Sequence, residues 1–175
     1  TICVGNIYIG GTGKTPLVNS LASHFKKKFK TYIIKKNYIS HVDEKNLLES
    51  KHKVIFEKTR ELSIAKAEKE KAEFLIFDDG LQEKKINYDL KIVCFNSIKL
   101  DGNGLIIPAG PLRERLSSIK NYDIVLINGN FIKETKNFIN KIKNINPDIK
   151  IFTGKYVPKN YFKLKKKKFI IFSGI

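Results

Sequence analysis

The feature that most constrains this chain is a glycine-rich turn that joins a short apolar run to a Lys-Thr pair. Residues 2–4 are apolar, residues 5–13 include four glycines, and Lys14 and Thr15 follow directly. An apolar strand, a glycine turn, Lys-Thr and a helix start occur in this order in phosphate-binding P-loops. Glycines let a phosphate approach the backbone N–H groups, and the helix start adds partial positive charge. The pattern predicts that Lys14 reaches phosphate oxygens and that the Thr15 hydroxyl binds Mg²⁺.

Tyr8 departs from the usual P-loop pattern, which has a glycine at this position. The alternative interpretation is a glycine-rich hairpin followed by an ordinary helix, and it leaves the Gly-Lys-Thr sequence unexplained. We therefore predict a nucleotide-binding segment that comprises Tyr8, Ile9, Gly10, Gly11, Thr12, Gly13, Lys14 and Thr15.

Short, continuous apolar runs separated by helical patterns predict an α/β fold with a mostly parallel sheet and helices on both faces. The expected strands are residues 2–4, 31–34, 54–56, 74–77, 90–95, 123–127 and 149–152. The expected helices are residues 16–27, 59–72 and 133–142, and Thr59 is expected to cap the second of them. This is the arrangement of a P-loop NTPase-like domain.

The chain has 175 residues, enough for one domain, or for one domain and the start of another. We expect a P-loop nucleotide-binding domain over residues 1–154, followed over residues 155–175 by a linker and the start of a truncated second domain. Both ends of the sequence lie in strand-like runs, so we expect a fragment. Cys3 and Cys94 also lie in apolar runs, which predicts buried, reduced thiols rather than a disulfide or a metal pair.

The net charge of +17 comes from 34 Lys and Arg against 17 Asp and Glu. Such an excess favours an anionic partner, either a nucleic acid or an acidic membrane surface. The alternative explanation is an AT-rich coding sequence, which inflates the lysine content without selecting for a ligand. Lysines are densest in residues 163–168, where a solvated tether between elements is the favoured interpretation.

An acidic pair, Asp78 and Asp79, follows the apolar residues 74–77. In P-loop proteins a buried strand delivers a carboxylate to its carboxyl end, beside the phosphates, where it holds Mg²⁺. An ordinary Asp-Gly turn would look the same in isolation. Since Gly13-Lys14-Thr15 is present in the same chain, we predict that Thr15, Asp78 and Asp79 form a metal site, with Asp79 also a catalytic candidate.

A long glycine- and proline-rich loop spans residues 101–114, and loops of this length in a compact domain usually bind something. Arg113 is a candidate for a phosphate contact, and Glu114 is expected to hold Arg113 in place. The alternative is a rigid bend with a surface ion pair. Asp43 and Glu44 form a second acidic pair in a polar region and, from their context alone, suggest a solvated loop.

Three stretches together resemble the tetraacyldisaccharide 4'-kinase family. Residues 4–18 read VGNIYIGGTGKTPLV and resemble the family's P-loop variant, in which a residue other than glycine at the Tyr8 position is normal. Residues 77–82 read FDDGLQ, and residues 102–114 read GNGLIIPAGPLRE. The order and spacing of these stretches agree with the family over residues 1–154.

The resemblance implies transfer of the γ-phosphate of ATP to the 4'-hydroxyl of a tetraacylated glucosamine disaccharide 1-phosphate, a step of lipid A biosynthesis. It implies Mg²⁺ as cofactor, a membrane surface as partner and work at the cytoplasmic face of the bacterial inner membrane. Lys14 and Asp43 are the implied catalytic residues, with Asp43 as the base. The implied substrate contacts are Tyr38, Glu44, Asn103 and Arg113.

This chain departs from the family pattern at several positions. Residues 35–40 read KKNYIS where the family has Ser-Arg-Gly-Tyr-Gly, so that only Tyr38 remains. Val42 replaces a glycine before Asp43, and Glu83 stands where the family has a histidine after its DDGLQ sequence. The family's N-terminal membrane-anchoring segment and its second half are not part of this sequence.

Two other functions compete with the lipid kinase at the level of sequence. A nucleic-acid-associated P-loop ATPase would use the positive charge, but the loop of residues 102–114 gives it no support, so we expect no nucleic-acid partner. A degenerate chain would bind nucleotide without catalysis, and only residues 35–40 and Glu83 suggest it. The oligomeric state stays open.

Overall fold

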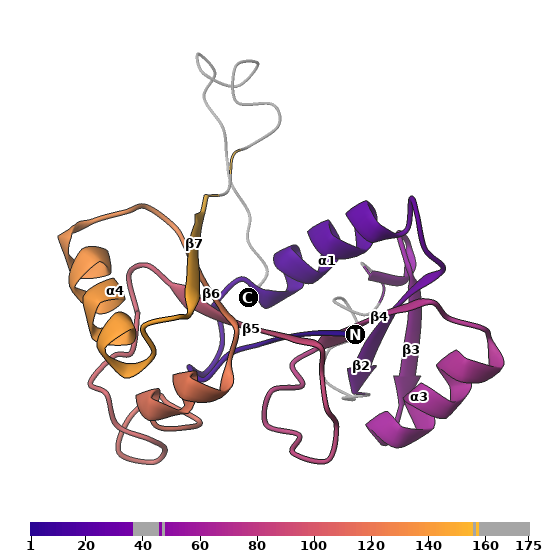
Figure 1. Ribbon diagram of the computed structural model, residues 1–175, viewed down its shortest axis with the longest axis horizontal. Helices are drawn as coiled ribbons and strands as arrows, with labels where there is room; N and C mark the ends of the chain where they lie inside the picture. Colours follow the sequence, from indigo (N-terminus) through magenta and orange to yellow (C-terminus); the bar gives the residue numbers. More distant parts are fainter. Residues whose placement is uncertain (37–45, 47, 156, 158–175) are drawn as a thin grey trace.

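Seven parallel strands form the centre of the fold in the computed structural model, which describes residues 1–36, 46, 48–155 and 157 (Figure 1). The strands are β1 (Ile2–Gly5), β2 (Thr31–Lys36), β3 (Lys53–Glu57), β4 (Phe74–Asp78), β5 (Leu90–Asn96), β6 (Ile124–Asn128) and β7 (Lys150–Gly154). Their order in the sheet is β3-β2-β4-β1-β5-β6-β7, and every pairing is parallel. The expected α/β fold with a parallel sheet is therefore confirmed.

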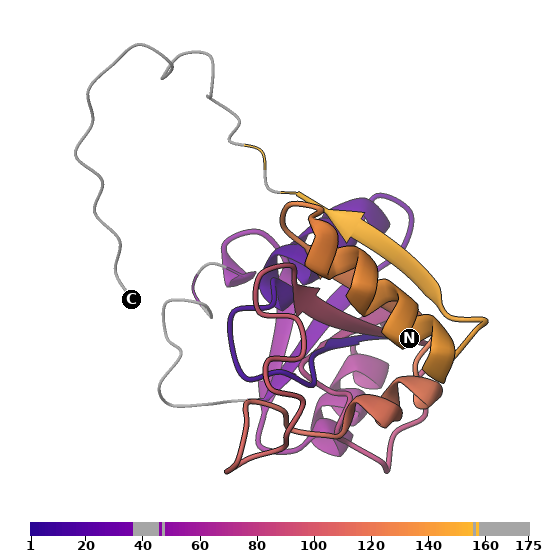
Figure 2. The ribbon, with the colours of Figure 1, turned by 90° about the vertical axis from the view of Figure 1, so that its left-hand side faces the viewer.

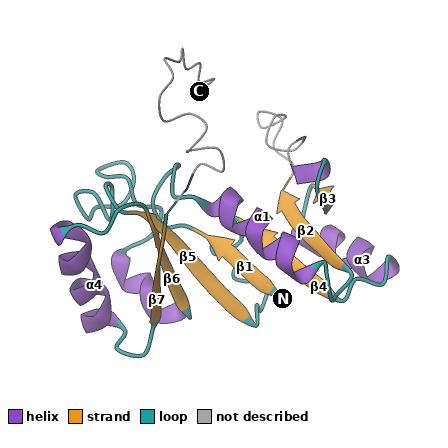
Figure 3. Ribbon diagram, turned by 90° about the horizontal axis from the view of Figure 1, so that it is seen from above, coloured by secondary structure: helices purple, strands orange, loops and turns teal. Residues whose placement is uncertain are grey.

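Helices cover both faces of this sheet. Helix α1 (Lys14–Phe25) lies across one face, above the strands in Figure 1, and α3 (Arg60–Lys69) lies below them. The 3-10 helix η1 (Leu116–Asn121) and α4 (Lys133–Ile145) pack on the same face as α3, against β5 and β6. Figure 2 shows α4 beside the edge strand β7, and Figure 3 shows α1 crossing in front of the sheet.

The core divides into two sides because successive side chains of a strand point to opposite faces. In β1, Val4 packs with Val18 and Ala22 of α1, whereas Cys3 packs on the other side with Ala67 of α3. Cys3 and Cys94 are both buried and free, as the sequence predicts. Because both faces of the sheet are covered, the strands consist of consecutive apolar residues rather than of alternating apolar and polar ones.

Local sequence signals set the ends of two helices. The Thr59 side chain accepts a hydrogen bond from the backbone N–H of Leu62 at 3.3 Å, which confirms the expected N-cap of α3. The helix η1 was not expected, because its six residues are too few for a helical pattern to stand out. Within the described residues no helix has the length and apolar character needed to cross a membrane.

Candidate functional site

The P-loop lies at the carboxyl end of β1 and leads directly into α1. Gly10, Gly11 and Gly13 have φ values of 66°, 54° and 85°, in the left-handed region that favours glycine. Gly13 is the N-cap residue of α1, no side chain caps the helix, and its first turn holds no acidic residue. The backbone N–H groups of that turn therefore face the loop, where they and the helix dipole favour an anion.

A cavity of about 400 Å³ joins this loop to the predicted acidic pair. Its lining comes from the turn after β1, from the end of β2, from the end of β4 and from the long loop after β5. The lining residues are Gly10, Gly11, Thr12, Gly13, Lys14, Thr15, Pro16, Lys35, Asp78, Asp79 and Arg113. Residues from four separate parts of the chain thus meet at one edge of the sheet, as expected for a parallel α/β fold.

Asp79 faces two basic side chains of the cavity lining. Arg113 Nη1 lies 2.8 Å and 3.0 Å from its two carboxylate oxygens, and Lys14 Nζ lies 3.7 Å from Oδ1. Its backbone adopts a φ of 61°, which Asp tolerates better than most residues. The Asp79 N–H donates to the carbonyl of Val4 at 2.8 Å, and Arg60 Nη2 donates to the Asp79 carbonyl. These bonds hold the carboxylate at the mouth of the P-loop.

Asp78 lies deeper, at the end of β4, and its side chain is only 1% exposed. It is in register with Val4 of β1 and with Lys35 of β2. Lys35 Nζ lies 2.9 Å from Asp78 Oδ2 and is itself largely buried. A buried carboxylate requires such a partner, because desolvation without one is costly.

The expectation that Glu114 holds Arg113 is wrong. Glu114 accepts hydrogen bonds from Gln82 Nε2 at 2.7 Å and from the Tyr122 hydroxyl at 3.0 Å, while Arg113 binds Asp79. Burial, and next the Glu114 carboxylate, raise the pKa of the Tyr122 hydroxyl, which therefore remains a donor. Arg113 and Glu114 are neighbours in a bend of the chain, yet Arg113 pairs with the end of β4 and Glu114 with Gln82 and Tyr122, so their side chains have different partners.

Three other predicted site residues lie beside the cavity rather than in its lining. Tyr8 forms an antiparallel bridge with Leu112, and the Ile9 N–H donates to the carbonyl of Pro111 at 2.9 Å. Asn103 braces the long loop, since its Nδ2 donates to the carbonyl of Ala109 at 2.9 Å. The predicted residues Tyr38, Asp43 and Glu44 lie outside the described part of the chain.

A second cavity, of about 390 Å³, adjoins the P-loop on the side of β5 and β6. Its lining residues are Asn96, Ser97, Ile98, Asn128, Gly129, Asn130, Ile132 and Lys155. Asn128 Nδ2 donates to the carbonyl of Thr12 at 2.7 Å, and Asn96 Nδ2 donates to that of Gly11 at 3.4 Å. Sequence reasoning missed both asparagines, although each is the last residue of its strand, at the edge where ligands bind.

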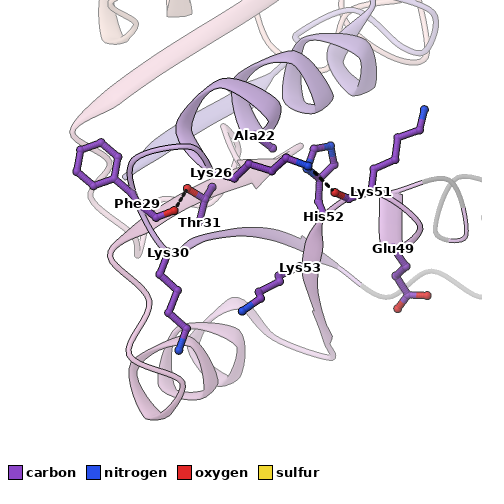
Figure 4. Close-up of a pocket in the computed structure, with 9 residues that line it drawn as sticks. All are labelled: Ala22, Lys26, Phe29, Lys30, Thr31, Glu49, Lys51, His52 and Lys53. Atoms are coloured by element: carbon purple, nitrogen blue, oxygen red, sulfur yellow. Dashed lines mark hydrogen bonds between the residues drawn. The ribbon is translucent and has the colours of Figure 1, made fainter.

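A third hollow lies away from this site, at the amino ends of β2 and β3 (Figure 4). Its lysines do not converge on one point. Lys26 Nζ donates to the carbonyl of Lys51 at 3.0 Å, Lys30 Nζ donates to that of Glu70, and Lys53 Nζ lies 5.5 Å from the ring centre of Tyr32. These three lysines therefore have separate partners and do not point at one shared centre.

The donor set of the main cavity fits Mg²⁺. This ion prefers oxygen ligands and usually takes one or two carboxylates together with phosphates and water. The hydroxyl of Thr15 and the carboxylates of Asp78 and Asp79 all line the cavity. Within the described residues no group of three or more His, Cys, Asp or Glu could hold a metal ion, so this oxygen set would depend on bound phosphates to complete it.

The parallel sheet, the P-loop and the acidic pair define a P-loop NTPase-like domain. A sequence model of the family described as Tetraacyldisaccharide-1-P 4'-kinase (LpxK) matches residues 1–175. This chain belongs to that family.

Curated relatives agree with this assignment. The tetraacyldisaccharide 4'-kinase of Pelagibacter ubique is 46% identical over 183 residues, which cover 100% of this chain and 56% of the relative. The enzyme of the same name from Ruthia magnifica is 35% identical, over 89% of this chain and 58% of the relative. The chain therefore spans a little over half the length of the relatives it matches.

Solved structures share the fold. LpxK from Aquifex aeolicus in complex with ATP has a TM-score of 0.62 and 20% identity, and the match covers 95% of this chain and 73% of that one. The hydrogenase maturation factor HypB from Archaeoglobus fulgidus has a TM-score of 0.60 and 15% identity, over 89% of this chain and 81% of that one. At these identities the likeness concerns the fold alone.

Proposed function

We propose that this chain is the ATP-binding, phosphoryl-transferring part of a tetraacyldisaccharide 4'-kinase. The observation that carries the proposal is the cavity in which the P-loop, Asp78, Asp79 and Arg113 meet, in a chain that belongs to this family. Phosphoryl transfer depends mainly on positioning and on charge stabilisation, and these residues supply both.

ATP is the proposed phosphate donor. Backbone N–H groups of residues 10–15 and Lys14 would hold its β- and γ-phosphates. The second cavity, which the Asn128–Thr12 and Asn96–Gly11 hydrogen bonds join to the P-loop, would take the nucleoside. The solved LpxK structure of similar fold was obtained in complex with ATP, which supports this choice of nucleotide.

Thr15, Asp78 and Asp79 would hold Mg²⁺, which would neutralise part of the phosphate charge. Lys14 and Arg113 would stabilise the charge that builds up on the transferred group, because both line the cavity. Asp43, seven residues beyond the end of β2 at Lys36, is the proposed base for the sugar hydroxyl. Tyr38, Glu44 and Asn103 are proposed substrate contacts on the strength of the family pattern.

The proposed acceptor is a tetraacylated glucosamine disaccharide 1-phosphate at a membrane surface. Apolar side chains lie exposed close to the cavity: Ile9, Leu105, Ile106 and Ile107 are 41% to 51% exposed. Backbone hydrogen bonds join their segments, from Ile9 to Pro111 and from Ile107 to Leu112, and Arg113 follows directly. Apolar groups beside a phosphate site fit a substrate that is both acylated and phosphorylated.

The proposed location is the cytoplasmic face of the inner membrane, where peripheral association would bring the lipid to the cavity. We also propose that residues 1–154 form the nucleotide-binding domain and that residues 155–175 lead into a second domain. The portion of the relatives that this chain does not span would supply that second domain.

The test is a transfer assay on the full-length protein with ATP labelled at the γ-phosphate and the tetraacyl disaccharide 1-phosphate. We expect label in the lipid, and a rate of labelling that is lower by about 100-fold or more with Lys14→Ala. Nucleotide binding without transfer would indicate a degenerate chain. ATP hydrolysis that DNA or RNA stimulates, with no lipid labelled, would favour the nucleic-acid ATPase and overturn the proposal.

A further inference from the structure

The carboxylates in the phosphate cavity are already matched with basic side chains of the same chain. Asp79 faces Arg113 and Lys14, and Asp78 faces Lys35. Lys14 belongs to the P-loop motif and Arg113 to the long loop, so the sequence already predicts both as residues of the site. Lys35 has no such motif, yet it lines the same cavity as the P-loop.

The Lys35–Asp78 pair is buried and close. The ammonium nitrogen lies 2.9 Å from Asp78 Oδ2, and the two side chains are 11% and 1% exposed. Asp78 is the last residue of β4 and Lys35 the last but one of the adjacent strand β2, and the two are in register. Their side chains therefore lie on the same face of the sheet, the face that α1 covers. Lys35 thus brings a unit of positive charge to a carboxylate that is also a proposed metal ligand.

We propose that Lys35 is a resident cation of the phosphate site, whose ammonium group competes with a divalent metal ion for Asp78. The inference rests on the proposed nucleotide site. Without a divalent ion, Lys35 neutralises Asp78 and adds attraction for the phosphates. With the ion present, two cations share one carboxylate, so the metal improves nucleotide binding less than it would without Lys35. Lys35 therefore acts as a positioning residue that sets how strongly nucleotide binding depends on metal.

The measured quantity is the dissociation constant of a non-hydrolysable ATP analogue on the full-length protein, once with EDTA and once with saturating Mg²⁺. The coupling ratio is the dissociation constant in EDTA divided by that in Mg²⁺, and it measures how much the metal strengthens nucleotide binding. Lys35→Gln removes the charge but keeps a hydrogen-bond donor for Asp78. We expect weaker binding in EDTA and a coupling ratio that rises on the order of tenfold, because a nearby unit charge is removed.

Two further variants separate this effect from damage to the site. Lys35→Arg keeps the charge and should keep the wild-type ratio. Lys36→Gln makes the same chemical change one residue along β2, at an exposed position on the other face of the sheet, and should also leave the ratio unchanged. General damage would weaken binding in both conditions by a similar factor, and thermal unfolding of each variant checks that it folds.

An unchanged ratio in folded Lys35→Gln would overturn the inference, since Lys35 would then be a structural partner of Asp78 alone. A lower ratio would also overturn it, because Lys35 would then help Asp78 to bind the metal. If the wild-type protein failed to bind the ATP analogue in either condition, the proposed function itself would fall. The two failures are therefore distinguishable.

Discussion

Arg113 binds both carboxylate oxygens of Asp79 through one nitrogen, at 2.8 Å and 3.0 Å, although 34 residues separate the two in the chain. The pair joins the loop after β5 to the end of β4 at the mouth of the P-loop. Arg113 thereby neutralises part of the negative charge of the Asp79 carboxylate at the place where nucleotide phosphates are proposed to bind. A guanidinium in this position could pass from the carboxylate to a phosphate, since it binds both in the same geometry.

Arg113→Gln should lower the rate of phosphoryl transfer about 10- to 100-fold, because charge at the transferred group would lose one stabilising partner. Steady-state kinetics of the full-length protein would measure it. Arg115→Gln changes an exposed arginine just after the loop, at the start of η1; it is the matched control and should retain activity. Equal losses in both variants would mean that the loop needs positive charge in general rather than this guanidinium.

Lys14→Ala should reduce turnover by about 100-fold or more, because the P-loop lysine contacts the β/γ-phosphates directly. Equilibrium binding of ATP and the transfer assay together would show whether binding or catalysis is lost. Lys27→Ala removes an exposed lysine just beyond the end of α1 and should behave as wild type. Normal turnover in Lys14→Ala would contradict the assignment of this cavity as the site of transfer.

The two cysteines should resist thiol reagents in the folded protein. Burial raises the pKa of the Cys3 and Cys94 thiols to about 12, so the reactive thiolate is scarce near neutral pH. A thiol reagent should modify Cys3 and Cys94 only after denaturation, and mass analysis of the peptides would detect the modification. Ser20→Cys, at an exposed position of α1, should label at once and so confirm that the reagent works. Rapid native labelling of Cys3 or Cys94 would show that its strand opens easily.

His52 should make stability depend on pH in mildly acidic solution. Burial, and then Lys26 and Lys51, lower its pKa from the ordinary 6.5, so the unfolded chain takes up a proton first as the pH falls. Stability present above about pH 6.5 should therefore decline below it, until His52 is protonated in the folded chain as well. Denaturant titrations from about pH 8 to pH 5 measure this decline.

His52→Gln should flatten this part of the profile while keeping a possible partner for Asn19, whose Oδ1 lies 2.8 Å from His52 Nε2. His24→Gln is the matched control, since His24 is exposed on the last turn of α1. If His24→Gln flattened the profile and His52→Gln left it unchanged, the pH dependence would come from His24, and the prediction for His52 would be wrong.

Phe138→Ala should destabilise the fold by about 3–5 kcal/mol, the usual cost of removing a buried phenylalanine. Phe138 is 3% exposed and packs edge-to-face on Phe95, with ring centres 4.9 Å apart. Phe131→Ala, at a residue 58% exposed, should change the free energy of unfolding by less than about 0.5 kcal/mol. Chemical denaturation of both variants gives the comparison, and equal losses would contradict the placement of α4 against β5.

Most of the fold could be predicted from the sequence because its signals are local. Continuous apolar runs mark strands buried on both faces, and all seven expected strands are present within a residue or two. The helix η1 was not predicted because six residues are too few to show a helical pattern of apolar side chains, although Leu116 and Ile119 are both buried. The partner of Glu114 was misjudged because adjacency in the sequence does not bring two side chains together: Glu114 is held by Gln82 and Tyr122 instead.

The sequence alone determined the P-loop and the strand that ends in Asp78, since a glycine turn, a Lys-Thr pair and an apolar run each act over a few neighbouring residues. Only the tertiary structure decided which groups face one another across the site. Strand order and register bring Lys35 to Asp78, and the return of the long loop brings Arg113 to Asp79. These pairings depend on contacts between residues distant in the chain, which no local pattern encodes.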